Sequence, residues 1–457
     1  MAKYKAYPEY KDSGVEWLGN VPTKWLITEL KRYSWVKGGY AFASDLFISF
    51  GEPVIRIGDI SQDGSINLAN CKYVSRTIAK QSQSYIVQNG ELLMAMTGAT
   101  IGKAGFYENK SPALINQRVG LFKTLDKLMN YRFLWYTLKS SGYQEYIKLT
   151  AFGGAQPNIS DAGMVGYRTT IPSLQEQVFI ASFLDNETAK IDSLIEKQQQ
   201  IIELLKEKRQ AVISHAVTKG LNPDMPMRDS GIEWLGKVPQ HWQCTKIKYI
   251  AILTPRKSSI RFKYNDKCTF IPMEKLKRNS LFTDENTLIN KVINSYTYFE
   301  DNDLLLAKVT PCFENKNIAI ADGLTNGIGF GSTEIYVLRT TKKIRADYLL
   351  YRLQEDNFMR AATSAMTGAG GLKRVPSEFL LNYPIALPPQ SEIDKIVESL
   401  SKQESHYNLL ELNAMQGIQL LKERRTALIS AAVTGKIDVR NWRAPDEQTT
   451  AEAEAAQ

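Results

Sequence analysis

The chain has 457 residues, of which 43% are hydrophobic and 23% charged, and its formal net charge is +9. This length allows about three domains, and the lack of an apolar run of about 18 residues excludes a membrane span. No apolar signal-peptide core follows Met1, so a cytoplasmic protein is expected, and the positive charge favours a polyanionic partner.

The first recognisable element, residues 12–25, occurs twice. Its pattern, Asp-Ser-Gly-x-Glu-Trp-Leu-Gly-x-Val-Pro-x-x-Trp, begins at Asp12 and again at Asp229, 217 positions later. A second block, residues 204–218, returns as residues 420–434, whereas the segments between these blocks barely resemble each other. Solenoid repeats have periods of about 20–50 residues, so this long period indicates a duplicated domain. Two copies of one frame with unlike inserts suit a protein that recognises two unlike half-sites.

The two inserts, residues 25–170 and 243–385, contain short β-rich runs separated by turn signals. Strands are predicted at residues 53–57, 83–87, 91–95 and 303–307, and short helices at 127–148 and 346–362. Both inserts are therefore expected to be mixed α+β modules.

Residues 174–219 have the hydrophobic spacing of a long helix, with Pro172 before it and Gly220 after it. Apolar side chains recur at alternating steps of four and three residues, which is typical of a coiled-coil seam. The predicted apolar seam consists of Ile180, Leu184, Ile191, Leu194, Ile201, Leu205 and Val212.

The same seam returns 216 positions later, between Pro389 and Gly435. Its members are Ile396, Leu400, Tyr407, Leu410, Ala414, Gly417, Leu421 and Leu428. The shared register predicts that the two helices pair with each other rather than being unrelated exposed helices. Antiparallel pairing would place the two modules at opposite ends of the pair.

The predicted fold class is therefore α+β with a pseudo-two-fold internal repeat. Two tandem mixed α/β modules are separated by two long helices that pair as an antiparallel coiled coil. The predicted divisions are 1–171 and 221–386 for the modules, 172–220 and 387–440 for the helical spacers, and 441–457 for a tail that is expected to be disordered.

Patterns that would carry chemistry are incomplete in this chain. Residues 98–103 have three residues instead of four between their glycines, and Ala104 rather than Ser or Thr follows Lys103, so a Gly-rich turn is expected and not a phosphate loop. The three histidines lie in or beside the repeated frame, and the four cysteines are far apart, which favours free thiols over zinc. No Asn-Pro-Pro-aromatic methyltransferase motif or nuclease constellation occurs. We expect no catalytic residue, no metal site and no bound cofactor.

Corresponding loops of the two inserts carry residues suited to DNA. Gln and Asn side chains pair with adenine, Arg with guanine, and Lys and Thr suit phosphates. The candidates in the first insert are Arg56, Thr97, Thr100, Lys103, Asn116, Gln117, Arg118, Gln156 and Asn158. Those in the second insert are Lys308, Thr310, Lys316, Ser332, Thr333, Lys373 and Arg374.

A basic run extends from Arg256 to Arg278, with interleaved aromatic residues. Its candidate DNA contacts are Arg256, Lys257, Lys275, Lys277 and Arg278. A solvated basic loop would have a similar composition, so both interpretations remain open from the sequence.

The doubled opening pattern and the two long helices, each with Pro before it and ending near residues 211–218 and 427–434, resemble the specificity subunits of Type I restriction–modification enzymes. The resemblance extends to about residue 440. It implies a non-catalytic subunit with two target-recognition domains that read a bipartite sequence in double-stranded DNA. It further implies two methylation subunits, which carry S-adenosylmethionine, and two motor–nuclease subunits, which use ATP and Mg²⁺. Together they would methylate adenine in host DNA or cleave unmodified DNA.

Two other classes of protein fit part of the pattern. A helical scaffold with protein-binding modules would bind DNA weakly and without sequence preference. A fragment of a fused DNA methyltransferase or nuclease would need catalytic motifs, and their absence from the sequence argues against it.

Overall fold

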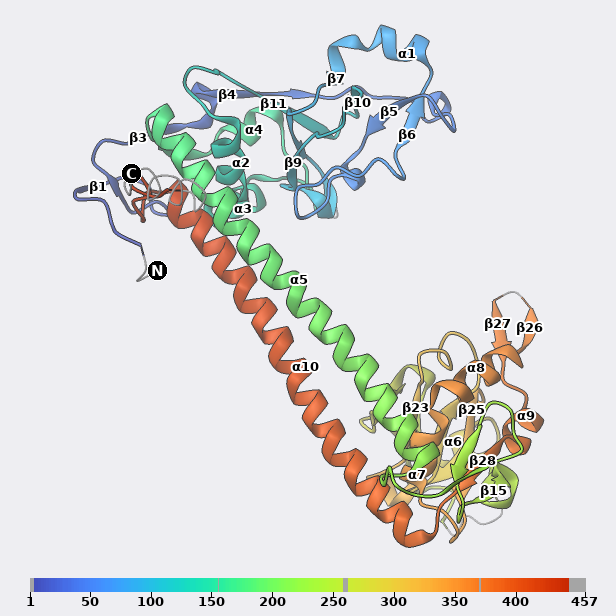
Figure 1. Cartoon of the computed structure of the whole chain (residues 1–457). Coiled ribbons are helices and arrows are strands. Elements are labelled where there is room, and N and C mark those ends of the chain that lie inside the picture. Colours follow the sequence, from blue (N-terminus) through green and yellow to red (C-terminus); the bar gives the residue numbers. More distant parts are fainter. Residues whose placement is uncertain (1–3, 155, 258–261, 370, 444–457) are drawn as a thin grey trace. The chain divides into compact units, whose positions relative to one another are not determined.

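The computed structural model describes residues 4–154, 156–257, 262–369 and 371–443. The part of the predicted tail from residue 444 onward lies outside the described residues. The chain forms two compact units: unit 1 comprises Met1–Gln199 and Gln416–Gln457, and unit 2 comprises Gln200–Met415. Each unit contains one insert together with a part of both long helices, α5 (Leu174–Lys219) and α10 (Gln390–Val433) (Figure 1).

Unit 1 has two four-stranded sheets, with strand orders β4-β11-β8-β9 and β6-β5-β10-β7. Their strands are β4 (Ser34–Gly38), β5 (Glu52–Ile55), β6 (Lys72–Val74), β7 (Ile86–Val87), β8 (Leu92–Ala95), β9 (Ala104–Phe106), β10 (Ala113–Ile115) and β11 (Val119–Thr124). Two strand pairs, β1 (Tyr10–Asp12) with β2 (Asn20–Pro22) and β3 (Leu26–Glu29) with β12 (Arg168–Ile171), and helices α1 (Arg76–Gln81), α2 (Tyr131–Lys139), α3 (Ser141–Thr150) and α4 (Asp161–Val165) complete it.

Unit 2 repeats this topology although the two inserts differ in sequence. Its four-stranded sheets have the orders β16-β25-β22-β23 and β20-β17-β24-β21, and the parallel pair β17–β24 corresponds to β5–β10. The strands are β16 (Ala251–Leu253), β17 (Lys267–Ile271), β20 (Asn286–Leu288), β21 (Thr297–Glu300), β22 (Leu304–Ala307), β23 (Ile318–Ile320), β24 (Ile328–Gly331) and β25 (Ile335–Thr340).

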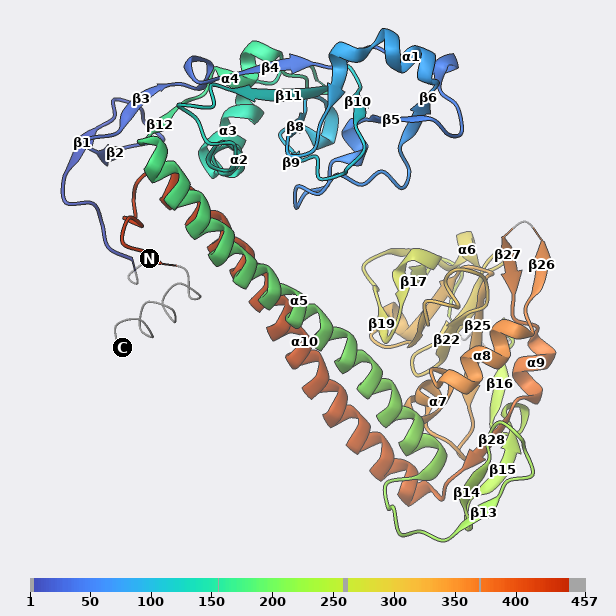
Figure 2. The ribbon, with the colours of Figure 1, turned by 45° about the horizontal axis from the view of Figure 1, so that its top comes forward.

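The remaining strands of unit 2 form two-stranded pairs, and its short helices surround the sheets (Figure 2). The pairs are β13 (Met227–Asp229) with β14 (Lys237–Pro239), β15 (Gln243–Lys246) with β28 (Pro384–Leu387), β18 (Leu276–Lys277) with β19 (Ser280–Leu281), and β26 (Thr367–Ala369) with β27 (Leu372–Arg374). The helices are α6 (Ile289–Val292), α7 (Ala346–Leu353), α8 (Asp356–Ser364) and α9 (Ser377–Asn382).

The predicted mixed α/β class is confirmed, with local differences at element ends. All four residues of β8 and of β22 are buried, as expected for apolar runs that are covered on both faces. The run predicted as a strand over 83–87 is mostly a turn, and only Ile86–Val87 pair. The helix predicted over 127–148 is broken at Ser140, whose extended backbone ends α2 and whose hydroxyl caps α3 by accepting from the Tyr143 backbone N–H.

Helix α5 has the predicted bounds because both of its ends are marked in the sequence. The Ser173 hydroxyl accepts a hydrogen bond from the Glu176 backbone N–H at the first turn. Gly220 follows the last turn with φ +80°, a left-handed conformation that favours glycine, and Gly435 follows α10 with φ +72°.

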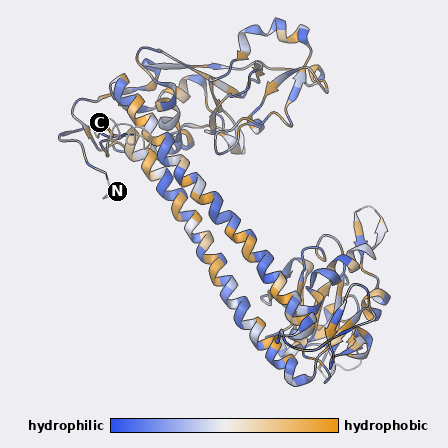
Figure 3. Cartoon of the chain, viewed as in Figure 1, coloured by the Kyte–Doolittle hydropathy of each residue, from blue (hydrophilic) through white to orange (hydrophobic). Residues whose placement is uncertain are grey.

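The two helices run antiparallel within each unit. In unit 1, the Asp192 carboxylate of α5 accepts two hydrogen bonds from Arg425 of α10, at 2.8 and 3.2 Å. In unit 2, Arg209 of α5 donates to Glu411 of α10 at 2.7 Å. Hydrophobic and hydrophilic residues alternate along both helices (Figure 3), as a seam between two helices requires.

The predicted phase of the seam on α5 is wrong at two positions. Leu194 and Ile201 are 48% and 44% exposed, whereas the adjacent Ile195 packs against the core and Ile202 is 7% exposed. The seam can run from Ile191 to Leu205 in two ways. Steps of three then four residues pass through Leu194 and Ile201, whereas steps of four then three pass through Ile195 and Ile202. Since Leu194-Ile195 and Ile201-Ile202 are adjacent apolar pairs, the sequence pattern does not distinguish the two phases.

The other predicted seam positions are buried or half-buried. Ile180, Leu184, Ile191, Ile396, Leu400, Tyr407, Ala414 and Leu428 are buried, and Leu205, Val212, Leu410, Gly417 and Leu421 are half-buried.

The phase can be tested with two neighbouring isoleucines. Ile202→Ala is expected to lower the free energy of unfolding by about 2 kcal/mol or more, because it removes buried methylene and methyl groups. Ile201→Ala, which makes the same chemical change on the exposed face, is expected to change it by less than about 0.5 kcal/mol. Urea unfolding followed by far-UV circular dichroism measures both. Equal losses would contradict the assigned phase.

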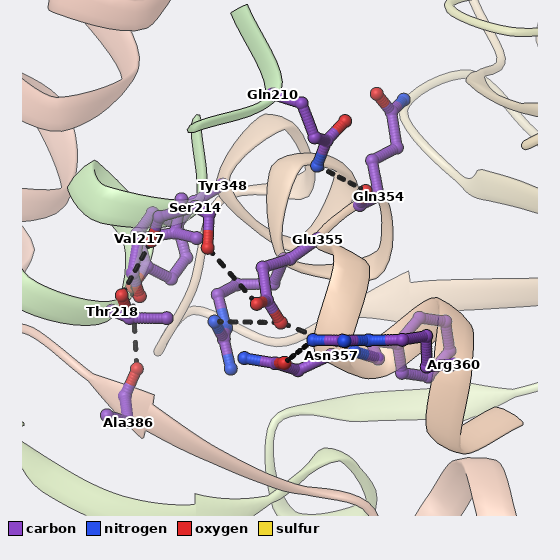
Figure 4. Close-up of polar contacts among 12 residues, drawn as sticks. Gln210, Ser214, Val217, Thr218, Tyr348, Gln354, Glu355, Asn357, Arg360 and Ala386 are labelled. Carbon is purple, nitrogen blue, oxygen red and sulfur yellow. Dashed lines mark hydrogen bonds and ion pairs between the residues drawn. The ribbon is translucent and has the colours of Figure 1, made fainter. Parts of the chain in front are cut away.

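The repeated frame contacts each module through an equivalent serine. In unit 1, the Ser430 hydroxyl of α10 accepts from the Ser141 backbone N–H at 3.0 Å. In unit 2, the Ser214 hydroxyl of α5 donates to the Glu355 carboxylate at 3.1 Å (Figure 4). The repeated serine therefore joins the helical frame to the module in both copies.

Candidate nucleic-acid interface

Three loops of unit 1 are joined by backbone hydrogen bonds at one end of the sheet that contains β8. The Met96 N–H donates to the Arg118 carbonyl at 2.9 Å, and the Ile159 N–H donates to the Met96 carbonyl at 3.0 Å. The Gly98 N–H donates to the Pro157 carbonyl at 2.8 Å. The loop after β8, the loop before β11 and the loop before α4 therefore form one surface, which we call the loop cluster of unit 1.

This loop cluster lines an open hollow of about 640 Å³. Five of the candidates predicted from the sequence line it, namely Thr97, Gln117, Arg118, Gln156 and Asn158. The Thr97 hydroxyl is buried and has no hydrogen-bond partner among the described residues. Gln117, Arg118 and Gln156 are exposed. Amide and guanidinium groups around a hollow present the donors and acceptors that base edges require.

The same three backbone bonds recur in unit 2. The Lys308 N–H donates to the Glu334 carbonyl at 3.0 Å, and the Val375 N–H donates to the Lys308 carbonyl at 2.9 Å. The Thr310 N–H donates to the Lys373 carbonyl at 3.0 Å. By these bonds Glu334 occupies the position of Arg118, and Arg374 occupies that of Asn158. The loop cluster of unit 2 thus shares the backbone attachments of unit 1 but presents other side chains.

The side chains of the second loop cluster contact one another. Arg374 donates to Glu334 through Nε at 2.8 Å and Nη2 at 3.0 Å. The hydrogen bond from Arg374 lowers the pKa of the Glu334 carboxyl. The Thr310 hydroxyl donates to the Gly371 carbonyl and accepts from the Lys373 N–H, while the Lys308 ammonium lies 5.2 Å from the centre of the Tyr336 ring. The predicted Ser332 and Thr333 precede Glu334 in the same loop.

Glu334 is not among the site residues predicted from the sequence. Glu334 could have been recognised from its place beside Ser332 and Thr333 and from the ability of a carboxylate to accept a hydrogen bond from cytosine. Its pairing with Arg374, 40 positions later in the chain, is visible only in the structure.

Some of the other candidates in unit 1 have structural contacts. The Thr100 hydroxyl donates to the Thr97 carbonyl, and the Asn116 N–H donates to the Ile55 carbonyl. The Arg56 N–H donates to the Asp59 carboxylate in the cap of a short turn. The Ala95 N–H donates to the Lys103 carbonyl as the Ala307 N–H does to Asn317, so Lys103 corresponds to Asn317 rather than to Lys316.

The basic run of unit 2 does not form a single surface with the loop cluster. Lys275 forms ion pairs with Asp284 at 2.9 Å and Glu285 at 3.0 Å, and Lys257 donates to the Ile293 carbonyl. Arg278 and Lys316 line a different hollow, of about 570 Å³, beside residues 206–214 of α5. Arg256 and Lys277 are exposed.

Burial lowers the pKa of Arg278 and of Lys316 in the hollow beside α5. Lys316 donates to Gln210, to the Gln354 carbonyl and to Asp356, each at 2.9 Å. The structure therefore gives Lys316 a role in joining α5 to α8.

Within the described part of the chain, no group of three or more His, Cys, Asp or Glu residues is placed to hold a metal ion. None of the described helices is both long and apolar enough to cross a membrane. The protein thus has two modules of like topology, each with a polar loop cluster, on a duplicated helical frame.

Comparison with known proteins identifies a specificity domain in the first part of the chain. Residues 22–205 match the family model described as "Type I restriction modification DNA specificity domain". The chain thus carries this specificity domain, and the resemblance to Type I specificity subunits that the doubled motifs predicted is confirmed.

Relatives from Escherichia coli match parts or most of the chain. The Type I restriction enzyme EcoEI specificity subunit is 32% identical over 213 residues, which are 45% of this chain and 35% of that protein. The EcoAI specificity subunit is 36% identical over 39% of this chain and 32% of that protein, so the chain spans about a third of each of these two relatives. The EcoKI specificity subunit is 22% identical over 93% of this chain and 92% of that protein.

Solved structures share the fold. A chain from the structure "Structural basis underlying complex assembly and conformational transition of the type I R-M system" matches with a TM-score of 0.69 at 13% identity, covering 91% of this chain and 99% of that one. The HsdS subunit from Thermoanaerobacter tengcongensis matches with a TM-score of 0.52 at 14% identity, covering 91% and 98%.

Proposed function

We propose that this chain is the non-catalytic DNA-recognition subunit of a Type I restriction–modification complex, and that each unit reads one half of a bipartite, asymmetric target. The observation that carries the proposal is the shared backbone architecture of the two loop clusters. One architecture presents Arg118 and Asn158 in unit 1 but Glu334 and Arg374 in unit 2. Side chains that differ at equivalent positions select different bases.

The proposed complex contains two methylation subunits, which bring S-adenosylmethionine, and two motor–nuclease subunits, which bring ATP and Mg²⁺. Adenine methylation and site-specific cleavage of DNA would belong to the assembled complex, in the cytoplasm. The specificity domain at residues 22–205 and the similarity to the Escherichia coli specificity subunits support this assignment.

The target can be measured by binding the full-length chain to a pool of duplexes with randomised sequence and sequencing the bound fraction. We expect two short, unequal motifs separated by unspecified base pairs. A continuous or palindromic motif would contradict the assignment of one half-site to each unit. Binding without any sequence preference would instead favour a helical scaffold with protein-binding modules.

A further inference from the structure

The loop cluster of unit 2 carries an exposed ion pair whose hydrogen-bonding capacity is only partly used. The side chains of Arg374 and Glu334 are 46% and 29% exposed. A guanidinium has five N–H donors, and the two bonds to Glu334 use two of them. These bonds come from Nε and Nη2, so the end of the guanidinium formed by Nη1 and Nη2 keeps three donors. Each carboxylate oxygen of Glu334 accepts one bond from Arg374 and retains a second lone pair.

The position of the pair places it at the candidate DNA surface. The three backbone bonds align Glu334 with Arg118 and Arg374 with Asn158, and both unit 1 residues line the hollow of about 640 Å³. Arg374 lies on β27, in the hairpin that stands out from the sheets of unit 2 (Figure 2). Thr310 fixes this hairpin by its bonds to Gly371 and Lys373. An ion pair at this place can meet a duplex without rearrangement of the sheets.

The order of donors and acceptors on the pair matches one kind of base pair. Across the major groove, G·C presents guanine N7 and O6 as acceptors and then the cytosine N4 amino group as a donor. A·T presents an acceptor, a donor and another acceptor. A guanidinium beside a carboxylate offers donors and then acceptors, which complements G·C and mismatches A·T.

We propose that Glu334 and Arg374 together read one G·C base pair in the half-site of unit 2, with Arg374 donating to guanine and Glu334 accepting from cytosine N4. This assignment rests on the proposed function. Because the two charges neutralise each other, the pair contributes selectivity for sequence rather than general affinity for phosphates.

A charge swap tests the orientation of this contact. The double variant Glu334→Arg with Arg374→Glu keeps an ion pair between the loops but exchanges the donor and acceptor positions. In selection from randomised duplexes, the wild-type full-length chain is expected to favour G·C at one position of one half-site. The swapped chain is expected to favour C·G at that position, with a preference of about 5- to 150-fold, as for one bidentate base contact.

An exposed ion pair elsewhere in unit 2 provides the matched control. Arg345 and Asp347 lie at the start of α7, are 44% and 28% exposed, and are bonded through the same guanidinium atoms. The swap Arg345→Asp with Asp347→Arg is expected to leave both half-sites unchanged.

The outcomes separate this proposal from the proposed function. If the wild-type chain selects a bipartite target but the Glu334/Arg374 swap leaves every position unchanged, the base-reading role is wrong and the pair is a structural tie. A change in both half-sites also overturns it. If the wild-type chain selects no sequence, the proposed function itself fails.

A conservative variant keeps the test valid if the swapped chain does not fold. Glu334→Gln retains the shape of the side chain, but its amide both donates and accepts. We expect selectivity at the same single position to fall by about 5-fold or more. Selectivity equal to wild type in this folded variant would overturn the proposal.

Discussion

Raising the salt concentration from about 50 to about 200 mM is expected to weaken DNA binding by this chain about 10³- to 10⁵-fold, the range for roughly six to ten phosphate contacts. Lys and Arg side chains that neutralise phosphates release condensed counterions, and this release becomes less favourable as salt rises. The net charge of +9 and the lysines at both loop clusters motivate the expectation. Titration of a labelled duplex with the full-length chain at several salt concentrations gives the slope. A dissociation constant that is unchanged over this range would contradict a DNA-binding role.

Two sets of substitutions then locate the phosphate contacts. Replacing Lys308 and Lys373 of the loop cluster by Ala is expected to reduce the salt slope by about two, since each contact contributes about 0.9. Replacing Lys275, Lys277 and Arg278 by Ala tests the basic run, for which the sequence left both interpretations open. We expect a smaller change there, because Lys275 is already paired with Asp284 and Glu285. If these substitutions in the basic run reduce the salt slope more than those of Lys308 and Lys373, the DNA instead lies along the basic run.

The frame was predictable because its signals are local. The apolar period, Pro172 before the first turn and Gly220 after the last turn define α5, and a repeat of 216 positions identifies α10. The phase of the seam was not predictable, since Leu194-Ile195 and Ile201-Ile202 offer apolar side chains on both sides of the helix.

The loops of the candidate site could be predicted from the sequence, but the arrangement of their side chains could not. Residues such as Gln117, Arg118 and Asn158 follow from base chemistry, and they do line one hollow. Corresponding loops of the two inserts were predicted from the sequence, but the equivalent backbone bonds that align them were not, because these bonds place no demand on side-chain identity. The composition of the basic run could not show that Arg278 lies beside α5, because that position depends on how the chain folds.

The structure of unit 2 depends on a buried charge pair at the start of α8. Arg352 and Glu355 are fully buried, and their closest charged atoms, Nη1 and Oε2, are 4.0 Å apart. Glu355 also caps α8 by accepting from the Phe358 N–H, and it accepts from Ser214 of α5 (Figure 4). No hydrogen-bond partner of the Arg352 guanidinium occurs in the described part of the chain. Glu355 thus supplies the nearby negative charge that offsets the cost of burying the Arg352 charge.

Glu355→Ser is expected to lower the free energy of unfolding of unit 2 by about 3–5 kcal/mol, because it leaves the Arg352 charge buried without a counter-charge. Serine retains the helix cap, as Ser140 does at the start of α3 in unit 1, so loss of the cap does not explain the effect. The double variant Arg352→Met with Glu355→Ser removes both charges while keeping most of the buried volume. It is expected to recover most of the lost stability, since replacing a buried pair by apolar groups is often neutral. Hydrogen–deuterium exchange with mass spectrometry measures the stability of residues 346–387 separately from that of unit 1. If the double variant is no more stable than Glu355→Ser, the cost comes from lost packing and not from the unpaired charge.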